Sequence, residues 1–159
     1  IRLIDEDTRS TLLQRLKESD PYDFERVVRT LLVRMGYGRD GRMTPLKGSG
    51  DGGLDGVIDR DELGLSKIYV QAKRWQSTIG REQIQNFVGA LVGKHATKGV
   101  FITTSDFHRN AVEYAKGVQH KIILVDGQRL AQLMIEYGVG VSTVRTITLK
   151  RVDSDYFEE

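Results

Sequence analysis

Apolar residues recur along the chain at two different spacings, and each spacing predicts a different kind of element. Positions three and four apart indicate amphipathic helices over residues 8–18 and 20–35. The second helix opens on Asp20 as a cap and Pro21 in the first turn, a combination that favours a helix start. The same spacing predicts further helices at 80–95, at 130–137 and from a Ser105 or Asp106 cap to residue 116.

Short apolar runs predict the strands. Residues 54–59 and 68–73 lie on either side of Leu63 and Gly64, which predicts an antiparallel hairpin. The later runs alternate with helices, as parallel strands joined by right-handed crossovers do. Further strands are expected at 100–103 and 122–125, with a short one at 42–45 and an edge strand within 142–152. The sequence therefore predicts an α/β fold with a mixed central sheet flanked by helices.

The length of 159 residues fits one main folding unit. We expect residues 1–19 to form an N-terminal helix and linker, residues 20–152 the main domain, and residues 153–159 an acidic, frayed tail. Because the first residue is Ile1 and not Met, we expect a missing upstream segment, which would hold a further domain.

Composition narrows the chemistry. The 24 basic and 22 acidic residues give a net charge of +2, which neither demands nor excludes a polyanionic partner. The segment from Arg60 to Lys98, however, contains seven basic and three acidic residues and is therefore positively charged. The absence of cysteine excludes disulfides and thiol chemistry and suits the reducing cytoplasm, where we expect the protein. The histidines lack metal-ligand spacing, and no run has the length of a membrane helix.

Polar residues with chemical potential gather in the glycine-rich stretch 48–73. Asp51 and Asp55 stand among glycines, and Gln71 and Lys73 follow on one face of the next strand. In the predicted hairpin, Asp55 falls roughly opposite Gln71 and Lys73. A carboxylate and an amide oxygen suit a hard divalent cation, and the neighbouring lysine suits a water molecule or a phosphate charge. The stretch therefore predicts metal-dependent phosphodiester hydrolysis.

Two other interpretations of this stretch are possible. Gly48, Gly50 and Gly53 satisfy the GxGxxG pattern of dinucleotide sites, but here the glycines precede a strand and stand among acids that repel phosphate. Alternatively, the stretch is a tight turn in which the aspartates bond the backbone and Lys73 is solvated. Each residue taken alone fits that second interpretation, whereas their combination favours a site. Asp51 is assigned to the turn.

The chain carries three spaced motifs, DGGLDGVI, VQAKRW and GVFITTSDF, the last followed by AVEYAKG. In this it resembles the catalytic domain of the Mrr family of restriction endonucleases, within the PD-(D/E)xK nuclease superfamily. The resemblance runs from about residue 24 to 137 and implies a restriction-endonuclease-like fold with 20–152 as the nuclease domain. It also implies that Asp55 and Gln71 bind metal and that Lys73 is the motif lysine.

The sequence departs from the superfamily pattern at two positions, both of them known variations in Mrr-like members. Leu54 replaces the proline before the aspartate, and Gln71 replaces a carboxylate. Because an amide attracts Mg²⁺ less strongly than a carboxylate, a further acid is expected to help. The resemblance favours Glu25, which matches the acid of the first core helix. From the residues alone, Glu25 is explained by its favourable position near a helix N-terminus.

The resemblance implies a type IV restriction-like endodeoxyribonuclease that cuts double-stranded, methylated DNA. Mg²⁺, with Mn²⁺ as a substitute, would be held by Asp55, Gln71 and Glu25, while Lys73 orients the attacking water or offsets charge. A homodimer or tetramer is expected, because cutting both strands requires two sites. Candidate phosphate contacts are Lys47, Arg74, Arg81, Lys94 and Lys98. The alternatives are a repair or junction-resolving nuclease of the same fold and a non-catalytic nucleic-acid-binding module.

Overall fold

The computed structural model describes residues 2–38, 43–45 and 53–158. The expectations for Arg42, Lys47, Gly48, Gly50 and Asp51 therefore lie outside the described residues. The strands form a five-stranded sheet in the order β1-β2-β3-β4-β5. They are β1 (Met43–Pro45), β2 (Gly53–Asp59), β3 (Lys67–Lys73), β4 (Lys98–Thr103) and β5 (Lys121–Val125). The first three strands are antiparallel and the last three are parallel, which confirms the predicted mixed sheet.

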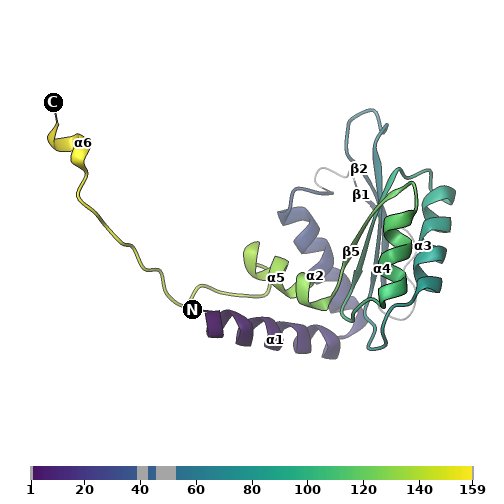
Figure 1. Ribbon diagram of the computed structural model, residues 1–159, viewed down its shortest axis with the longest axis horizontal. Coiled ribbons are helices and arrows are strands. Elements are labelled where there is room, and N and C mark those ends of the chain that lie inside the picture. Colours follow the sequence, from purple (N-terminus) through teal and green to yellow (C-terminus); the bar gives the residue numbers. More distant parts are fainter. Residues whose placement is uncertain (1, 39–42, 46–52, 159) are drawn as a thin grey trace.

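Helices cover both faces of the sheet (Figure 1). They are α1 (Arg2–Glu18), α2 (Pro21–Arg34), α3 (Arg81–Gly93), α4 (Arg109–Gly117), α5 (Gly127–Glu136) and the short α6 (Ser154–Phe157). Leucines of α1 and the apolar sides of α2 and α5 share one hydrophobic core with the sheet, called here the first core. Those of α3 and α4 share the second core. Among the described helices, none combines the length and the apolar character needed to span a membrane.

Strict alternation along β3 assigns its side chains to the two cores. Ile68, Val70 and Ala72 belong to the first core, and Tyr69 belongs to the second. The Tyr69 ring stacks on Phe87 of α3, with 5.2 Å between the ring centroids. Gly99 allows this packing, because a Cβ there would lie 2.7 Å from the Phe87 ring. The aromatic layer therefore fixes one face of β3 against α3.

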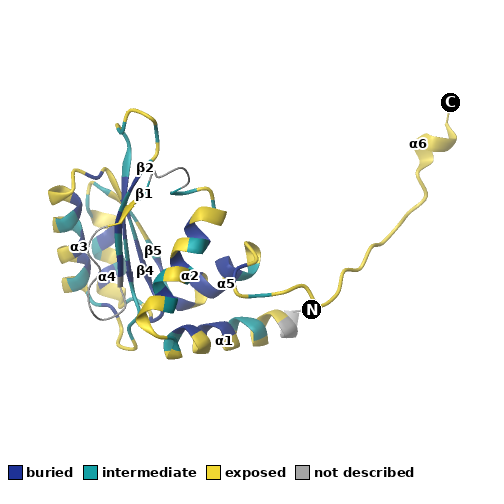
Figure 2. Cartoon of the chain, turned by 180° about the vertical axis from the view of Figure 1, so that it is seen from behind, coloured by how far each residue is buried: buried dark blue, intermediate teal, exposed yellow. Residues whose placement is uncertain are grey.

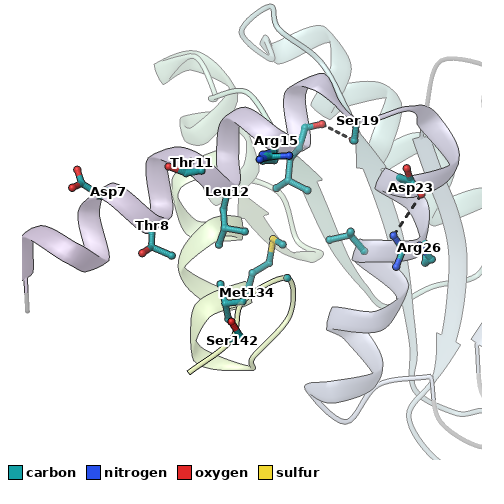
Figure 3. Close-up of a pocket in the computed structure, with 14 residues that line it drawn as sticks. Asp7, Thr8, Thr11, Leu12, Arg15, Ser19, Asp23, Arg26, Met134 and Ser142 are labelled. Atoms are coloured by element: carbon teal, nitrogen blue, oxygen red, sulfur yellow. Dashed lines mark hydrogen bonds and ion pairs between the residues drawn. The ribbon is translucent and has the colours of Figure 1, made fainter. Parts of the chain in front are cut away.

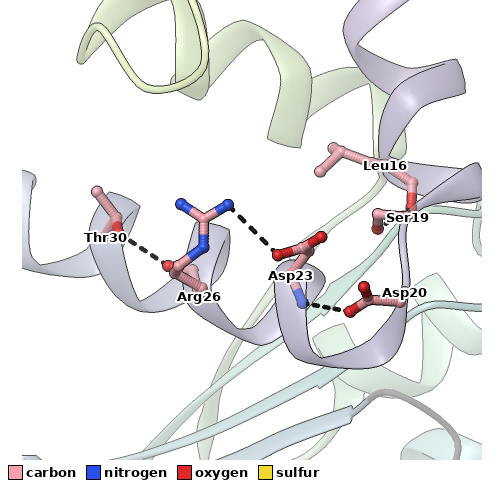
Figure 4. Close-up of polar contacts among 6 residues, drawn as sticks. All are labelled: Leu16, Ser19, Asp20, Asp23, Arg26 and Thr30. Carbon is pink, nitrogen blue, oxygen red and sulfur yellow. Dashed lines mark hydrogen bonds and ion pairs between the residues drawn. The ribbon is translucent and has the colours of Figure 1, made fainter.

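The start of α2 confirms the predicted cap (Figure 4). The backbone N–H of Asp23 donates to Asp20 Oδ1 at 2.8 Å, and Pro21 occupies the first turn. Asp23 in turn lies 3.5 Å from Arg26 Nη2. Caps of this kind typically stabilise a helix by about 1 kcal/mol. The local sequence therefore fixes where this helix begins.

The predicted start of α4 was wrong. The cap is His108, whose Nδ1 accepts the N–H of Asn110 at 3.1 Å, and the helix begins at Arg109. The predicted caps are engaged elsewhere: Ser105 Oγ donates to the Gln76 carbonyl at 3.3 Å, and Asp106 Oδ1 accepts from Thr78 Oγ1 at 2.6 Å. Both side chains bind residues distant in the sequence and therefore do not cap the helix.

The predicted edge strand within 142–152 was also wrong. These residues form no strand in the described part of the chain and run away from the body as an exposed segment (Figure 1). The alternation supplies two faces, but in this structure no sheet edge lies beside them. In the tail, Ser154–Phe157 form the single-turn helix α6, where a frayed end was expected.

Candidate active site

The hairpin brings three predicted site residues, Asp55, Gln71 and Lys73, together on one face of the sheet. We call them the trio. Asp55 of β2 pairs directly with Gln71 of β3, as the sequence predicted. Lys73 lies two residues beyond Gln71 and therefore projects to the same side of the strand. A carboxylate, an amide and an ammonium group thus gather near the end of the hairpin where β2 begins.

The Asp55 carboxylate is half-buried and only partly satisfied. Its Oδ1 atom is buried with no hydrogen-bond partner among the described residues, and the Tyr69 side chain lies close enough to interact with the carboxylate. Burial, and secondarily Asp55, raises the pKa of Tyr69 well above its usual range, so the hydroxyl remains a donor. A buried oxygen left without a partner is costly and suits a cation ligand. The donor set therefore fits an oxygen-binding divalent ion.

A second carboxylate on the same strand shows that the unpaired oxygen alone does not mark the site. Asp59 Oδ1 is also buried and without a described partner. Asp59, however, lies opposite Lys67, whereas Asp55 lies opposite the amide of Gln71. In the described part of the chain, the Gln71 side chain makes no hydrogen bond that would occupy its oxygen. The pairing of two available oxygens is what distinguishes Asp55.

Lys73 lies over an aromatic ring that sequence reasoning had not assigned to the site. Its Nζ atom is 4.9 Å from the centre of the Trp75 indole ring. The end of β3 is held by buried hydroxyl residues after β4: Thr104 Oγ1 donates to the Trp75 carbonyl at 2.9 Å, and the Thr104 N–H donates to the Lys73 carbonyl at 3.3 Å. The TTS of the third motif therefore fixes the strand end that carries the lysine.

The sequence places Tyr69 on the same strand face as Gln71 and Lys73, but it assigned neither Tyr69 nor Trp75 to the site, because each has the character of an ordinary core aromatic. The available signal was the two-residue alternation of a strand. Tyr69 and Trp75 have odd numbers, as Gln71 and Lys73 do, and odd positions along this strand and its extension share one face. Their contacts with Asp55 and Lys73 depend on ring orientation, which comes from packing against the second core. Sequence periodicity could nominate these residues, but only packing could place them.

Among the hydrogen bonds and ion pairs of the described residues, none joins Glu25 to the trio. Its helix, α2, buries its apolar side in the first core, on the face of the sheet opposite Tyr69. Glu25 Oε1 lies 4.0 Å from Arg29 Nη2. Within the described ranges, no three His, Cys, Asp or Glu residues gather as a metal site. The role of Glu25 as a metal ligand stays a prediction.

The predicted phosphate contacts differ in their surroundings. Arg74 Nη1 donates to the Lys17 carbonyl at 3.2 Å and so ties β3 to the end of α1. Arg81 stacks its guanidinium over Tyr114 at 5.2 Å. Lys94 and Lys98 are exposed. Arg74 is therefore primarily a structural contact, while the other three remain available to a polyanion.

A large hollow of about 780 Å³ lies between α1, α2 and the segment after α5 (Figure 3). Its walls include Leu12, Arg15, Arg26 and Met134. No member of the trio lines it. The hollow is therefore separate from the candidate active site.

Comparison with known proteins identifies the family of this chain. The catalytic-domain model of the Mrr family, described as a restriction endonuclease, matches residues 16–134. The chain belongs to the Mrr family of restriction endonucleases. A type IV methyl-directed restriction enzyme of Escherichia coli K12, EcoKMrr, is 51% identical over 149 residues, which are 92% of this chain and 48% of that protein. This Mrr-family chain thus spans about half the length of that relative.

More distant matches are one further protein sequence and two solved structures. An uncharacterised protein of Sinorhizobium fredii is 26% identical over 117 residues, which are 71% of this chain and 29% of that protein. The modification-dependent restriction endonuclease AspBHI has a TM-score of 0.61, and the match covers 85% of this chain and 36% of the AspBHI chain. MspJI, solved with a 27-mer oligonucleotide, has a TM-score of 0.55, and the match covers 82% of this chain and 31% of the MspJI chain. Both structures are 24% identical and confirm the restriction-endonuclease-like fold.

Proposed function

We propose that this chain is the catalytic domain of a type IV-like restriction endonuclease that hydrolyses phosphodiester bonds in methylated double-stranded DNA. The observation that carries the proposal is the direct pairing of Asp55 with Gln71, with Lys73 on the same face. Membership of the Mrr family supports it, as does the modification-directed activity in the names of EcoKMrr and AspBHI.

In the proposed reaction, the trio works on a single phosphate. The Asp55 carboxylate and the Gln71 amide oxygen would hold Mg²⁺, for which Mn²⁺ would substitute, and Glu25 is the proposed third ligand. When bound, such an ion polarises the phosphate and lowers the pKa of its water. Lys73, oriented by Trp75, positions the attacking water or offsets charge on the phosphate. The water would lose one proton to solvent and bond to phosphorus while the bond between phosphorus and the 3′ oxygen breaks. The leaving oxygen would take up a proton from solvent, which gives 5′-phosphate and 3′-hydroxyl ends.

DNA would be held through its backbone by the exposed bases near the site. Arg81, Lys94 and Lys98 are the proposed phosphate contacts, which position DNA without reading its sequence. Cutting both strands calls for two copies of the trio, so we propose a homodimer or tetramer. A cytoplasmic location, where a restriction enzyme meets incoming DNA, completes the proposal.

The deciding experiment is cleavage of methylated and unmethylated plasmid by Asp55→Asn and Lys73→Ala. The matched controls are Asp59→Asn and Lys67→Ala, which remove the same groups from the same strand faces near the other end of the hairpin. Both site variants are expected to lose cutting in Mg²⁺ while circular dichroism stays unchanged, and both controls are expected to cut. The original chain should stop cutting when a chelator is added.

Other outcomes would replace the proposal. Full activity in both site variants would contradict the assignment of the trio. Preference for branched over methylated duplex DNA would indicate a repair or junction-resolving nuclease. Absence of Mg²⁺ and Mn²⁺ binding by calorimetry, with DNA binding unchanged in Asp55→Asn, would indicate a non-catalytic binding module.

The proposed role of Glu25 needs its own test. Glu25→Gln should raise the Mg²⁺ concentration required for cutting and weaken Mg²⁺ binding measured by calorimetry. Arg29→Gln is the control, because it removes the ion-pair partner and leaves the carboxylate in place. Equal metal binding by Glu25→Gln and the original chain would remove Glu25 from the site.

A further inference from the structure

Residues 143–152 are an extended segment whose side chains find no partner in the described structure. They alternate as a strand does, and their apolar members lie in solvent: Val144 is 98% exposed and Leu149 is 91% exposed. Figure 2 shows the segment exposed along its whole course. Clustered exposed apolar residues mark interaction surfaces. A strand pattern without a neighbouring strand therefore calls for a partner from elsewhere.

The sheet ends in a strand that offers such a partner. Among the described strands, β5 pairs only with β4, so its other edge has backbone groups available for pairing. Ile123, near the middle of this edge strand, is 46% exposed. An edge strand of this kind accepts an added strand through main-chain hydrogen bonds.

A hollow borders β5 on each face of the sheet. On the α5 side, an apolar hollow of about 220 Å³ is lined by Ile123, Val125 and Leu133. On the α4 side, a hollow of about 460 Å³ is lined by Ile122, Leu124 and Val112. Because successive side chains of a strand point to opposite faces, a strand beside β5 would send its side chains toward both hollows.

We propose that residues 143–152 of one copy of this chain add as a further strand beside β5 of a second copy. The added strand would hydrogen-bond to β5, with Val144 and Val152 toward one face and Ile147 and Leu149 toward the other. Each copy has one such segment and one such edge. Two reciprocal junctions therefore close a symmetric pair and leave neither edge open.

The geometry favours a second copy over pairing within one chain. Val139 is buried in the first core and Val141 packs against it, which anchors the root of the segment beside α5. From there the segment leaves the body of the molecule and runs away from the sheet (Figure 1). The direction of departure carries it away from its own β5.

This pairing deepens the proposed association of two nuclease copies, but it does not depend on catalysis. It is measured without DNA or metal, so its failure and the failure of the nuclease proposal are distinguishable. The test is the molar mass of the whole chain by light scattering. The expected mass is at least twice the 18.0 kDa of one chain.

Two variants separate the segment from the rest of the surface. Ile147→Glu with Leu149→Glu should reduce the mass to one chain. The matched control, Leu63→Glu with Leu65→Glu, changes residues that are 82% and 77% exposed at the hairpin turn and should leave the mass unchanged. Far-ultraviolet circular dichroism should show the same helical content for all three proteins.

A mixing experiment tests that the contact joins two copies. Ile123→Lys damages the receiving edge and should also give single chains. When it is mixed with the Ile147→Glu, Leu149→Glu variant, one intact segment meets one intact edge, so a mixed pair should form. Single chains at every concentration of the unaltered protein, an unchanged mass in the segment variant, or no mixed pair would each overturn the proposal.

Discussion

The Lys73 ammonium nitrogen lies 4.9 Å from the centre of the Trp75 indole ring, within the range of a cation–π interaction. The two residues are two positions apart, so an extended backbone sends both to one side of β3. Thr104 holds the backbone at both positions through its hydroxyl and its N–H. The ring thereby limits where the ammonium can go.

Loss of this ring should slow cutting without abolishing it. A cation–π contact is worth about 0.5–2 kcal/mol, so Trp75→Leu should lower kcat/KM by about 2- to 30-fold. Trp75→Phe keeps an aromatic face, so its kcat/KM should lie between that of the unaltered protein and that of Trp75→Leu. Because Trp75 is the single tryptophan, Lys73→Ala should also shift the tryptophan fluorescence, whereas Lys67→Ala should not. An unchanged spectrum in Lys73→Ala would show that the contact is absent in solution.

Tyr69→Phe should destabilise the fold and disturb Asp55. The substitution removes the buried hydroxyl that interacts with the half-buried carboxylate, which should cost about 1–3 kcal/mol of unfolding free energy. Urea unfolding measures this, and plasmid cutting should fall in parallel. Tyr156→Phe removes a hydroxyl from a tyrosine that is exposed in the tail and serves as the control. Equal stability of the two variants would argue against the Tyr69–Asp55 interaction.

Gln71→Glu should make the fold depend on metal. Two carboxylates directly opposite each other on paired strands repel, which should lower the unfolding free energy by about 0.2–1 kcal/mol in a chelator. Mg²⁺ should reverse this loss, because a carboxylate is a stronger ligand than an amide. Thermal unfolding with and without Mg²⁺ gives the comparison, with the exposed Gln85→Glu as control. An equal Mg²⁺ response in both variants would place the ion elsewhere.

Asp61 should make the hairpin turn sensitive to acid. The backbone N–H of Leu65 donates to its carboxylate at 2.9 Å and that of Ser66 at 2.8 Å, and these bonds, Leu65 first, lower the pKa of Asp61 below the ordinary 3.8. A lowered folded-state pKa stabilises the fold above the unfolded-state value, and this stabilisation is lost as the pH falls through the folded-state value.

Asp61→Asn removes that titration. Its deficit in unfolding free energy relative to the original chain should be constant near neutral pH and should shrink once the pH falls below 3.8. Urea unfolding across the pH range measures the deficit. Glu62→Gln changes the neighbouring turn acid, which makes no hydrogen bond in the described structure, and should show little deficit. A pH-independent deficit in Asp61→Asn would contradict the assignment.

Gly127→Ala should be strongly destabilising. A Cβ at this position would lie 2.3 Å from the Thr104 carbonyl oxygen, so the start of α5 must move away from the end of β4. Overpacking of this kind costs about 1–3 kcal/mol or more. Gly89→Ala is the matched control, since nothing lies within 4 Å of its Cβ and alanine favours a helix by about 1 kcal/mol. Destabilisation by both or by neither would contradict this account.

Local sequence patterns predicted the hairpin and therefore the central residues of the candidate site. The alternation in β3 and the turn at Gly64 set the register, and the register alone places Asp55 opposite Gln71. The α2 start was equally local, because Asp20 and Pro21 act within one turn. The helix start at Arg109 was not determined locally, because Gln76 and Thr78 of a distant loop bind the two predicted cap residues.

The sequence by itself determined the mixed sheet and the face shared by Asp55, Gln71 and Lys73, because two-residue periodicity and turn chemistry act between near neighbours. Only the tertiary structure decided that Tyr69 lies beside Asp55, that Trp75 underlies Lys73, and that Arg74 donates to the end of α1. It also left residues 143–152 without a neighbouring strand. These outcomes depend on which distant groups compete for the same side chain or edge, and a one-dimensional pattern does not record that competition.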